Sequence, residues 1–395
     1  MYFGNTLGNK KIQNLLIQEA SVNRIPHAQL FVGPEGCFKL PMAIAFATYL
    51  FCKNKGQHES CKDCEDCAKM SKLTHPDLHF FFPTIKTEKE EKKSKSKDGF
   101  SVFQQTLLNN PSMNMRDWQM KLKSENKTIG IRTRDILEIK SISNLRSYGG
   151  GYKVFIVWCA ETMNMQASNT FLKSLEEPSD NTIFILISHR PLELLPTITS
   201  RLQVKRFQKI ESSVLLNHFK KINPDLNKEN ILNYISEFSH NYNEIKNCLE
   251  AGPQLNPLEN MFVSWVRLAF LSANPRAKLK NAENNNKDAV IPLLIDWCSD
   301  MGKQEKHKQL EFIQMAIGVF RHAFLLNYNF ANSKYDNLND LGFSLNQFSK
   351  YITRNNVLEI VNLLDTSHSS LRRYANSKLL FLDLSFCLGN LLRKN

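Results

Sequence analysis

Four cysteines in one short stretch offer sulfur atoms for a metal ion. The stretch "CKNKGQHESCKDCEDC" places them at Cys52, Cys61, Cys64 and Cys67, with the spacing C-x8-C-x2-C-x2-C. Two overlapping C-x2-C steps turn thiolates toward one point, and the longer loop lets Cys52 complete a tetrahedron. Four sulfur ligands suit structural zinc, which leaves no open coordination position for catalysis. An iron–sulfur cluster uses the same ligand set, and a redox dithiol is a further alternative.

A second stretch, "LFVGPEGCFKLPMAIAFA", begins like a phosphate-binding loop. That loop reads G-x-x-x-x-G-K-[ST] and lies between a strand and a helix. Gly33 and Lys39 are in register, with Gly36 between them. Phe38 replaces the second glycine, whose missing Cβ lets the backbone wrap a phosphate. Leu40 replaces the hydroxyl that binds Mg²⁺.

The strand that should carry catalytic acids also lacks them. In "KVFIVWCAETMN", Trp158 and Cys159 follow the strand where a nucleotide hydrolase needs carboxylates for Mg²⁺ and water. Neither side chain is a hard oxygen donor. We therefore expect a degenerate loop that holds no cofactor and a chain that does not hydrolyse ATP. Lys39 is interpreted as packing its stem on the helix, and Glu161 as a helix-start residue rather than a substitute base.

Helices and strands alternate around these motifs. Continuous apolar runs predict buried strands, and periodic apolar positions predict helices. Continuous rather than alternating apolar strands favour a parallel sheet with both faces covered. The expected strands are residues 28–32, 152–158 and 181–188, and the expected helices are residues 9–24, 39–51 and 164–178, with another that begins at Thr133 or its neighbour.

After Phe207 the pattern changes to helices alone. "KENILNYISEFS" and "YNEIKNCLEAG" predict two short helices, and we expect the chain to be helical from residue 257. The fold class is therefore α/β plus all-α. The expected domains are 1–208, with a cysteine module at 52–67 and a charged insertion at 86–100, then 209–255 and 256–395. The insertion, "KTEKEEKKSKSKDGF", is interpreted as a solvated loop or disordered segment without assigned function.

Hydrophobic content and net charge restrict the kinds of protein that this chain could be. The 395 residues are 42% hydrophobic, which is enough for packed cores. No apolar run is long enough for a membrane span, and the first residues lack a secretion signal, so we expect a cytoplasmic protein. A net charge of +13 favours contact with nucleic acid or with a complex that binds it. A lysine-rich surface that keeps the protein soluble is the alternative.

Five blocks in a fixed order carry a resemblance to a known family. They are "IPHAQLFVGPEG", the cysteine cluster, "HPDLHFFFP", "KVFIVWCAETMNMQASNTFLKSLEEP" and "TIFILISHRPLELLPTITSRLQ". Together they resemble the delta-prime family of bacterial DNA polymerase III clamp-loader subunits, strongly over residues 24–207 and more weakly beyond. The resemblance implies an AAA+-type parallel α/β domain with an inserted zinc module, a small helical lid and a C-terminal helical collar. It also implies Zn²⁺ as structural cofactor, tau/gamma and delta subunits as partners, and the sliding clamp and primed DNA reached through the complex.

The same resemblance gives Arg201 a role. "TSRLQ" places Ser200 and Arg201 where the family has Ser-Arg-Cys, and Leu202 departs from the cysteine. In the family this arginine reaches across an interface to the γ-phosphate of ATP held by a neighbouring subunit. The alternative is an arginine that caps a helix or pairs with a surface acid. The resemblance also implies that Asn243 stands where motor subunits have a nucleotide-sensing arginine.

Two other functions remain open from the residues. One is an active, tau/gamma-like ATPase subunit, against which the missing acids argue. The other is a zinc-dependent nucleic-acid-binding module, which leaves "TSR" and the α/β core unexplained. Glu176 and Glu177 invite an acid/base role, but adjacent helix residues do not face one substrate, so both are interpreted as structural.

Overall fold

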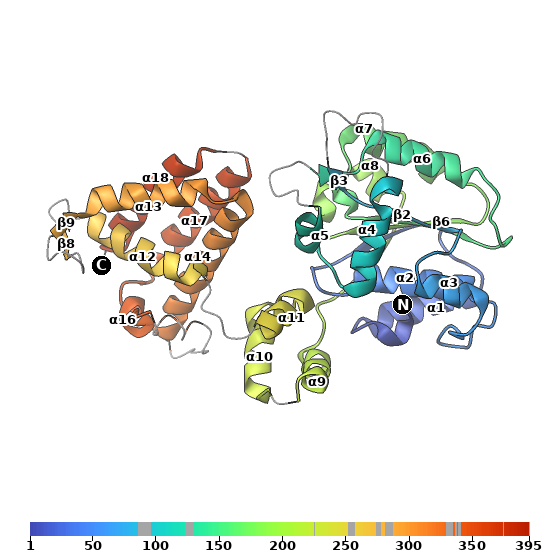
Figure 1. Cartoon of the computed structure of the whole chain (residues 1–395), viewed down its shortest axis with the longest axis horizontal. Coiled ribbons are helices and arrows are strands. Elements are labelled where there is room, and N and C mark those ends of the chain that lie inside the picture. The colour runs from blue at the N-terminus through green and yellow to red at the C-terminus, as the bar shows by residue number, and fades with distance from the viewer. Residues whose placement is uncertain are drawn as a thin grey trace. The chain divides into compact units, whose positions relative to one another are not determined.

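The chain divides into two compact units, Met1–Glu250 and Ala251–Asn395, which are taken one at a time below (Figure 1). No helix among the described residues is long and apolar enough to cross a membrane. The computed structural model describes residues 1–85, 96–122, 129–224, 226–251, 257–273, 278–280, 287–328, 335, 338, 341–373 and 375–394.

A parallel five-stranded sheet organises the first unit. Its strand order is β2-β5-β6-β1-β7, and every neighbouring pair runs parallel. The three predicted strands are confirmed as β1, β5 and β6, and all their residues are buried. The strands β2 and β7 were not predicted, because β2 lies inside a short aromatic run and β7 is mostly exposed at the sheet edge. The bounds are β1 Ala28–Val32, β2 Leu78–Phe81, β5 Lys153–Trp158, β6 Thr182–Ser188 and β7 Gln203–Arg206.

Helices cover both faces of this sheet, as the continuous apolar strands predicted. Side chains alternate along each strand, so Ile185 of β6 joins one core while Phe184 joins the other. The first face is covered by α1 Lys10–Ser21, α2 Lys39–Phe51, α4 Ser96–Asn109 and α5 Met115–Lys121. The second face is covered by α6 Thr133–Ser143, α7 Met165–Glu176 and α8 Pro196–Thr199.

Shorter elements complete the first unit. They are α3 Glu65–Ser71, the antiparallel pair β3 Thr84–Ile85 and β4 Ile129–Gly130, and the 3-10 helices η1 Phe3–Asn5, η3 Ala160–Thr162 and η4 Pro191–Glu193.

The charged insertion is shorter than predicted. Residues 86–95 lie outside the described residues, but residues 96–100 form the start of α4 rather than a loop. Phe103 and Leu107 anchor this helix in the core, and the helix extends back from them into polar sequence. Composition alone placed the boundary too late, because Ser, Lys, Asp and Gly are typical of loops.

A separate apolar cluster gathers the helices after the sheet. These are α9 Ser212–Ile222, α10 Lys228–Glu237 and α11 Tyr242–Ala251, of which the last two were predicted. Their buried side chains include Leu215, Phe219 and Ile245, and Phe38 from the first part of the chain packs among them. By their contacts these helices belong to the first unit. A separate lid domain at 209–255 stays a prediction.

The second unit is mostly helical, as predicted. Its helices are α12 Pro257–Ser272, α13 Val290–Lys303, α14 Lys306–Leu326, α16 Leu345–Ser349, α17 Val357–Arg372 and α18 Ser377–Leu391. They surround a core in which the indole nitrogen of Trp265 donates to the Ser385 hydroxyl at 2.7 Å. The expectation of helices alone is wrong at β8 Lys278–Lys280 and β9 Lys287–Ala289, which pair antiparallel. Strands this short show too few alternations to be recognised from sequence.

We predict that Lys205→Met weakens the attachment of β7. The side chains of Lys205 and Glu19 are 2% and 12% exposed, and their ion pair ties β7 to α1. Removing the lysine leaves a buried carboxylate without its counter-charge, which costs about 3–5 kcal/mol. Hydrogen exchange followed by mass spectrometry should show lower protection of the β1 and β7 amides. Lys209→Met, at an exposed position, is the matched control, and equal protection in the two variants would contradict the prediction.

Candidate functional site

The loop between β1 and α2 is closed by its own lysine. Lys39 is the first residue of α2 and is only 3% exposed. Its ammonium donates to the carbonyl oxygens of Gly33 at 2.6 Å and Pro34 at 2.5 Å. Burial lowers the pKa of Lys39, and the nearby Cys37 opposes that shift. The interpretation from sequence, in which the Lys39 stem packs on the helix, did not include this inward turn of the ammonium onto the loop.

The tip of the same loop packs against the start of α11. Gly36 has a φ of +73°, and a Cβ there would lie 2.6 Å from the backbone nitrogen of Tyr242. Phe38 also has a left-handed backbone, with a φ of +64°. Its ring meets the Tyr242 ring edge-on, with centroids 4.8 Å apart. The phenyl group is thus drawn into the α9–α11 cluster, and two left-handed residues let the loop reach it.

The positions that would hold Mg²⁺ are occupied by core side chains. Leu40 is 4% exposed and packs against the first face of the sheet. Trp158 ends β5 and Cys159 follows it, and both are fully enclosed. None of the three offers an oxygen ligand, so the site lacks the donors that Mg²⁺ prefers.

Charged and titratable groups gather near the ends of β1, β5 and β6. Glu161 lies in the first turn of η3, as predicted, and its Oε1 accepts from the His189 backbone N–H at 3.2 Å. Burial lowers the pKa of His189 to about 3, with Lys39 and Arg190 adding to the shift. Burial raises the pKa of Glu35, while Lys39 opposes that rise. Oε2 of Glu161 and both ring nitrogens of His189 are buried without a hydrogen-bond partner among the described residues.

Two asparagines join distant segments of the first unit, and one of them, Asn9, bonds to the loop. Asn243 is 2% exposed, and its amide donates to the carbonyl oxygen of Ser112 at 2.6 Å, which ties α11 to the segment before α5. Asn9 donates to the carbonyls of Cys37 and Gln208, at 3.3 and 3.1 Å. Asn9 could not be singled out from the sequence, since a lone asparagine before a helix has many uses.

Arg201 lies apart from that loop, after α8. Its Nη2 pairs with Oε1 of Glu176 at 2.6 Å, and its Nη1 donates to the Thr197 carbonyl at 2.9 Å. Ser200 is 3.4 Å from the same Nη1. The arginine side chain is 38% exposed. The sequence did not predict the Glu176 contact, because the two residues are on different elements.

Leu202 stands at the position where the Ser-Arg-Cys pattern has its cysteine. It is 7% exposed and joins the core on the second face of the sheet, with Leu194 and Ile198. This packing anchors the residue next to Arg201. The guanidinium therefore projects from a fixed base rather than from a free loop.

The four predicted cysteines come together around one point. Their sulfur atoms all lie within 4.8 Å of one another. Cys61 Sγ is 3.4 Å from Cys52 Sγ and 3.9 Å from Cys67 Sγ. Tetrahedral zinc with Zn–S bonds of about 2.3 Å needs sulfurs about 3.8 Å apart, so the cluster fits that ion. His58, in the intervening loop, is exposed and is not among the candidate ligands.

Three of the four cysteines lie at or near the ends of helices. Cys52 follows the last residue of α2, and Cys64 precedes the first residue of α3, which contains Cys67. Backbone N–H groups of Cys64 and Asp63 lower the pKa of Cys61 to about 6. Burial raises the pKa of Cys67. A bound cation would supply the charge that keeps the buried thiolate deprotonated.

Known proteins match mainly the sheet-containing part of the chain. The family model described as "DNA polymerase III, delta subunit" matches residues 8–211. The DNA polymerase III subunit delta' of Bacillus subtilis (strain 168) is 28% identical over 205 residues, which are 52% of this chain and 49% of that protein. The subunit delta' of Pseudomonas aeruginosa is 32% identical over 175 residues, which are 44% of this chain and 41% of that protein.

A tau subunit matches as well. The DNA polymerase III subunit tau of Bacillus subtilis (strain 168) is 26% identical over 213 residues, which are 54% of this chain and 29% of that protein. The chain spans about half the length, or less, of these curated relatives.

We predict that Cys61→Ser removes the metal. The protein should bind about one zinc ion per chain, and the variant close to none, because structural zinc needs all four ligands. Metal content after dialysis, measured by mass spectrometry, tests this. Cys387→Ser is the matched control, since Cys387 lies on α18 outside the cluster. Equal zinc content in the two variants would contradict the prediction.

Proposed function

The chain belongs to the DNA polymerase III delta subunit family, and we propose that it is a delta-prime-type subunit of the clamp loader. In this proposal it has an AAA+-type domain with a degenerate nucleotide site, and it supplies Arg201 to the ATP site of a neighbouring subunit. The main observation behind this proposal is that the loop between β1 and α2 is closed, because the Lys39 ammonium donates to the loop's own carbonyl oxygens.

A closed loop argues against ATP hydrolysis by this chain. A working loop presents a free ammonium and backbone N–H groups to phosphate. Here the ammonium is buried and bonded, and Phe38 and Gly36 are packed against α11. Opening the loop would strip a buried cation of its partners, which is unfavourable. The three positions without oxygen ligands add to the same argument.

Arg201 remains suited to act on a partner. A guanidinium stabilises charge on a transferring phosphoryl group, and its planar shape matches phosphate oxygens. The side chain is 38% exposed on a firmly packed segment. Ser200 supports it, since the Ser200 hydroxyl donates to the Thr197 carbonyl that also accepts from Arg201. The helix-capping and acid-pairing contacts of the alternative interpretation are both present, and the side chain is 38% exposed with both in place.

The proposed assembly follows from this role. The partners would be the tau/gamma and delta subunits, and the sliding clamp and primed DNA would be reached through the complex. The chain would act in the cytoplasm as a subunit of the DNA polymerase holoenzyme. Residues 209–255 would form the lid and residues 256–395 the collar. Zinc on Cys52, Cys61, Cys64 and Cys67 would stabilise the module without taking part in hydrolysis.

The second candidate is an active, tau/gamma-like motor. The match to a tau subunit favours it. The positions that would bind Mg²⁺ in a motor hold Leu40, Trp158 and Cys159, and none of these side chains offers the oxygen donor that Mg²⁺ needs. This argues against the motor candidate.

We predict that Arg201→Ala slows ATP turnover of the reconstituted clamp loader. Loss of an arginine finger lowers the rate at the site it serves by roughly 10³-fold or more. Clamp- and DNA-stimulated ATPase assays should show the loss, while gel filtration shows an intact complex. The chain alone should be inactive. Activity of the chain alone would support the motor candidate, and full activity of the variant complex would contradict the finger.

Glu176→Ala should have a smaller effect on the same assay. Glu176 restrains the guanidinium, and an arginine side chain loses up to about 2 kcal/mol of conformational freedom when it is fixed. We expect turnover at saturating ATP to fall by roughly three- to tenfold with little change in KM. Glu177→Ala is the matched control, since Glu177 is the next residue and does not pair with Arg201. Equal rates in these two variants would exclude a positioning role for Glu176.

A further inference from the structure

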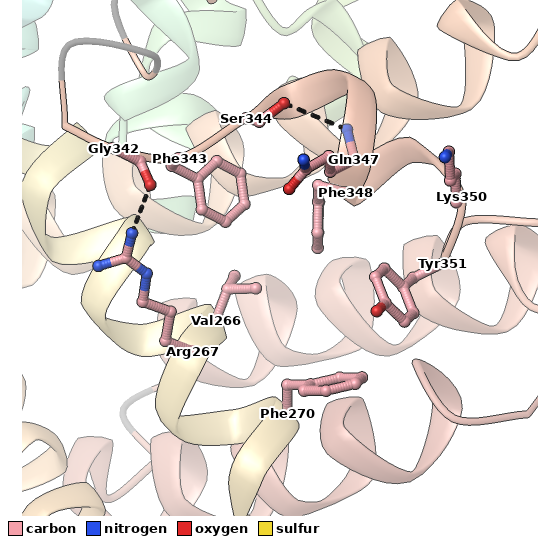
Figure 2. Close-up of a pocket in the computed structure, with 10 residues that line it drawn as sticks. All are labelled: Val266, Arg267, Phe270, Gly342, Phe343, Ser344, Gln347, Phe348, Lys350 and Tyr351. Carbon is pink, nitrogen blue, oxygen red and sulfur yellow. Dashed lines mark hydrogen bonds between the residues drawn. The ribbon is translucent and has the colours of Figure 1, made fainter. Parts of the chain in front are cut away.

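A hollow on the second unit is unrelated to the proposed ATP chemistry. It has a volume of about 650 Å³ and lies between α12 and the segment that contains α16 (Figure 2). Pockets of this size commonly bind ligands or side chains. The helical unit therefore offers a preformed recess.

Contacts at both ends hold the recess open. At one end Arg267 on α12 donates through Nη2 to the carbonyl of Gly342 at 2.7 Å. At the other end the rings of Phe270 and Tyr351 meet edge-on, with centroids 5.0 Å apart. In Figure 2 the Arg267–Gly342 contact and the Phe270–Tyr351 pair lie on opposite sides of the recess. The two walls are thus fixed at their ends and separated in the middle.

The bottom of the recess is apolar and well packed. Val266, Phe343 and Phe348 are 3%, 8% and 7% exposed. The rings of Phe343 and Phe348 lie 5.0 Å apart, and both contact Phe262 in the core.

The rim carries hydrogen-bond donors and positive charge. Lys350 is exposed, and no ion pair or hydrogen bond engages its ammonium within the described part of the chain. Arg267 uses one N–H on Gly342 and keeps others. Arg393 lies with its guanidinium carbon 4.9 Å from the centre of the Phe270 ring. None of the described residues lining the recess is acidic.

We propose that this recess docks an acidic peptide segment of a partner protein. The segment would place an aromatic or branched apolar side chain in the recess against Tyr351, which is 40% exposed. Flanking Asp or Glu carboxylates would meet Lys350 and Arg267. Charge complementarity selects this ligand, because Lys350 and Arg267 lie on the rim and none of the described lining residues carries a carboxylate.

Single-stranded nucleic acid fits the recess less well. Binding of bases needs open aromatic faces for stacking. Phe343 and Phe348 are almost wholly buried, and Arg393 already lies over the Phe270 ring. Among the described residues that line the recess, only Tyr351, which is 40% exposed, has an open ring face.

Fluorescence anisotropy on the full chain tests the proposal. The probe is a fluorescein-labelled peptide in which Phe and Leu residues are flanked by Asp and Glu. A second peptide carries Ser in place of Phe and Leu at the same net charge. Lys350→Glu should weaken binding of the first peptide by roughly fivefold or more, because attraction becomes repulsion. Tyr351→Ala should weaken it as well, through the recess wall rather than through charge.

Lys378→Glu is the matched control, since it makes the same charge change at an exposed position on α18. It should leave the affinity nearly unchanged. The proposal is overturned if the first peptide does not saturate, or if Lys378→Glu weakens it as much as Lys350→Glu. It is also overturned if the Ser peptide binds equally well, or if oligo-dT displaces the probe more strongly than unlabelled peptide does.

Discussion

The Lys39 ammonium donates to the carbonyl oxygens of Gly33 and Pro34. These two bonds fix the shape of the loop between β1 and α2, and the packing of the first unit around this loop depends on that shape. A buried ammonium is costly unless hydrogen-bonded, so these bonds hold the loop in one shape. That shape carries Phe38 into the apolar cluster of α9–α11. The helices after the sheet are therefore attached to the loop by packing rather than by a bound nucleotide.

The parts predicted well are those with a strong local signal. The bounds of β1 and α2 were predicted to the residue, and β5, β6 and α7 within a residue or two, because continuous apolar runs and periodic stripes are long there. The convergence of the cysteines was also predicted, since C-x2-C spacing constrains geometry locally. The substitutions at Phe38 and Leu40 were visible because the loop pattern fixes each position.

The parts missed depend on contacts between distant segments. The ammonium of Lys39 turns inward because of the shape of its loop, and the tip of that loop packs against Tyr242, about two hundred residues further along the chain. The Arg201–Glu176 pair joins two elements, and the Asn243–Ser112 bond joins two others. Edge strand β7 was missed because its exposed residues lack the apolar run that marked its neighbours. Single-sequence patterns do not carry such information.

The first unit thus combines an inward-facing and an outward-facing cation. Lys39 is buried, bonded and removed from any ligand, whereas Arg201 is half-exposed and held at one side by Glu176. The two arrangements suit a subunit that keeps its own site shut and contributes charge to another. Closure of the loop is the step on which this account rests.

Titration of a fluorescent ATP analogue into the isolated chain, with Mg²⁺ present, tests that closure most directly. The account predicts no saturable binding, and it predicts the same result for Lys39→Met, together with a lower melting temperature because the loop carbonyls lose their donor. Saturable binding to the wild-type chain that Lys39→Met abolishes would contradict it. That result would mean that the ammonium leaves the loop carbonyls for phosphate and that the site is open to nucleotide.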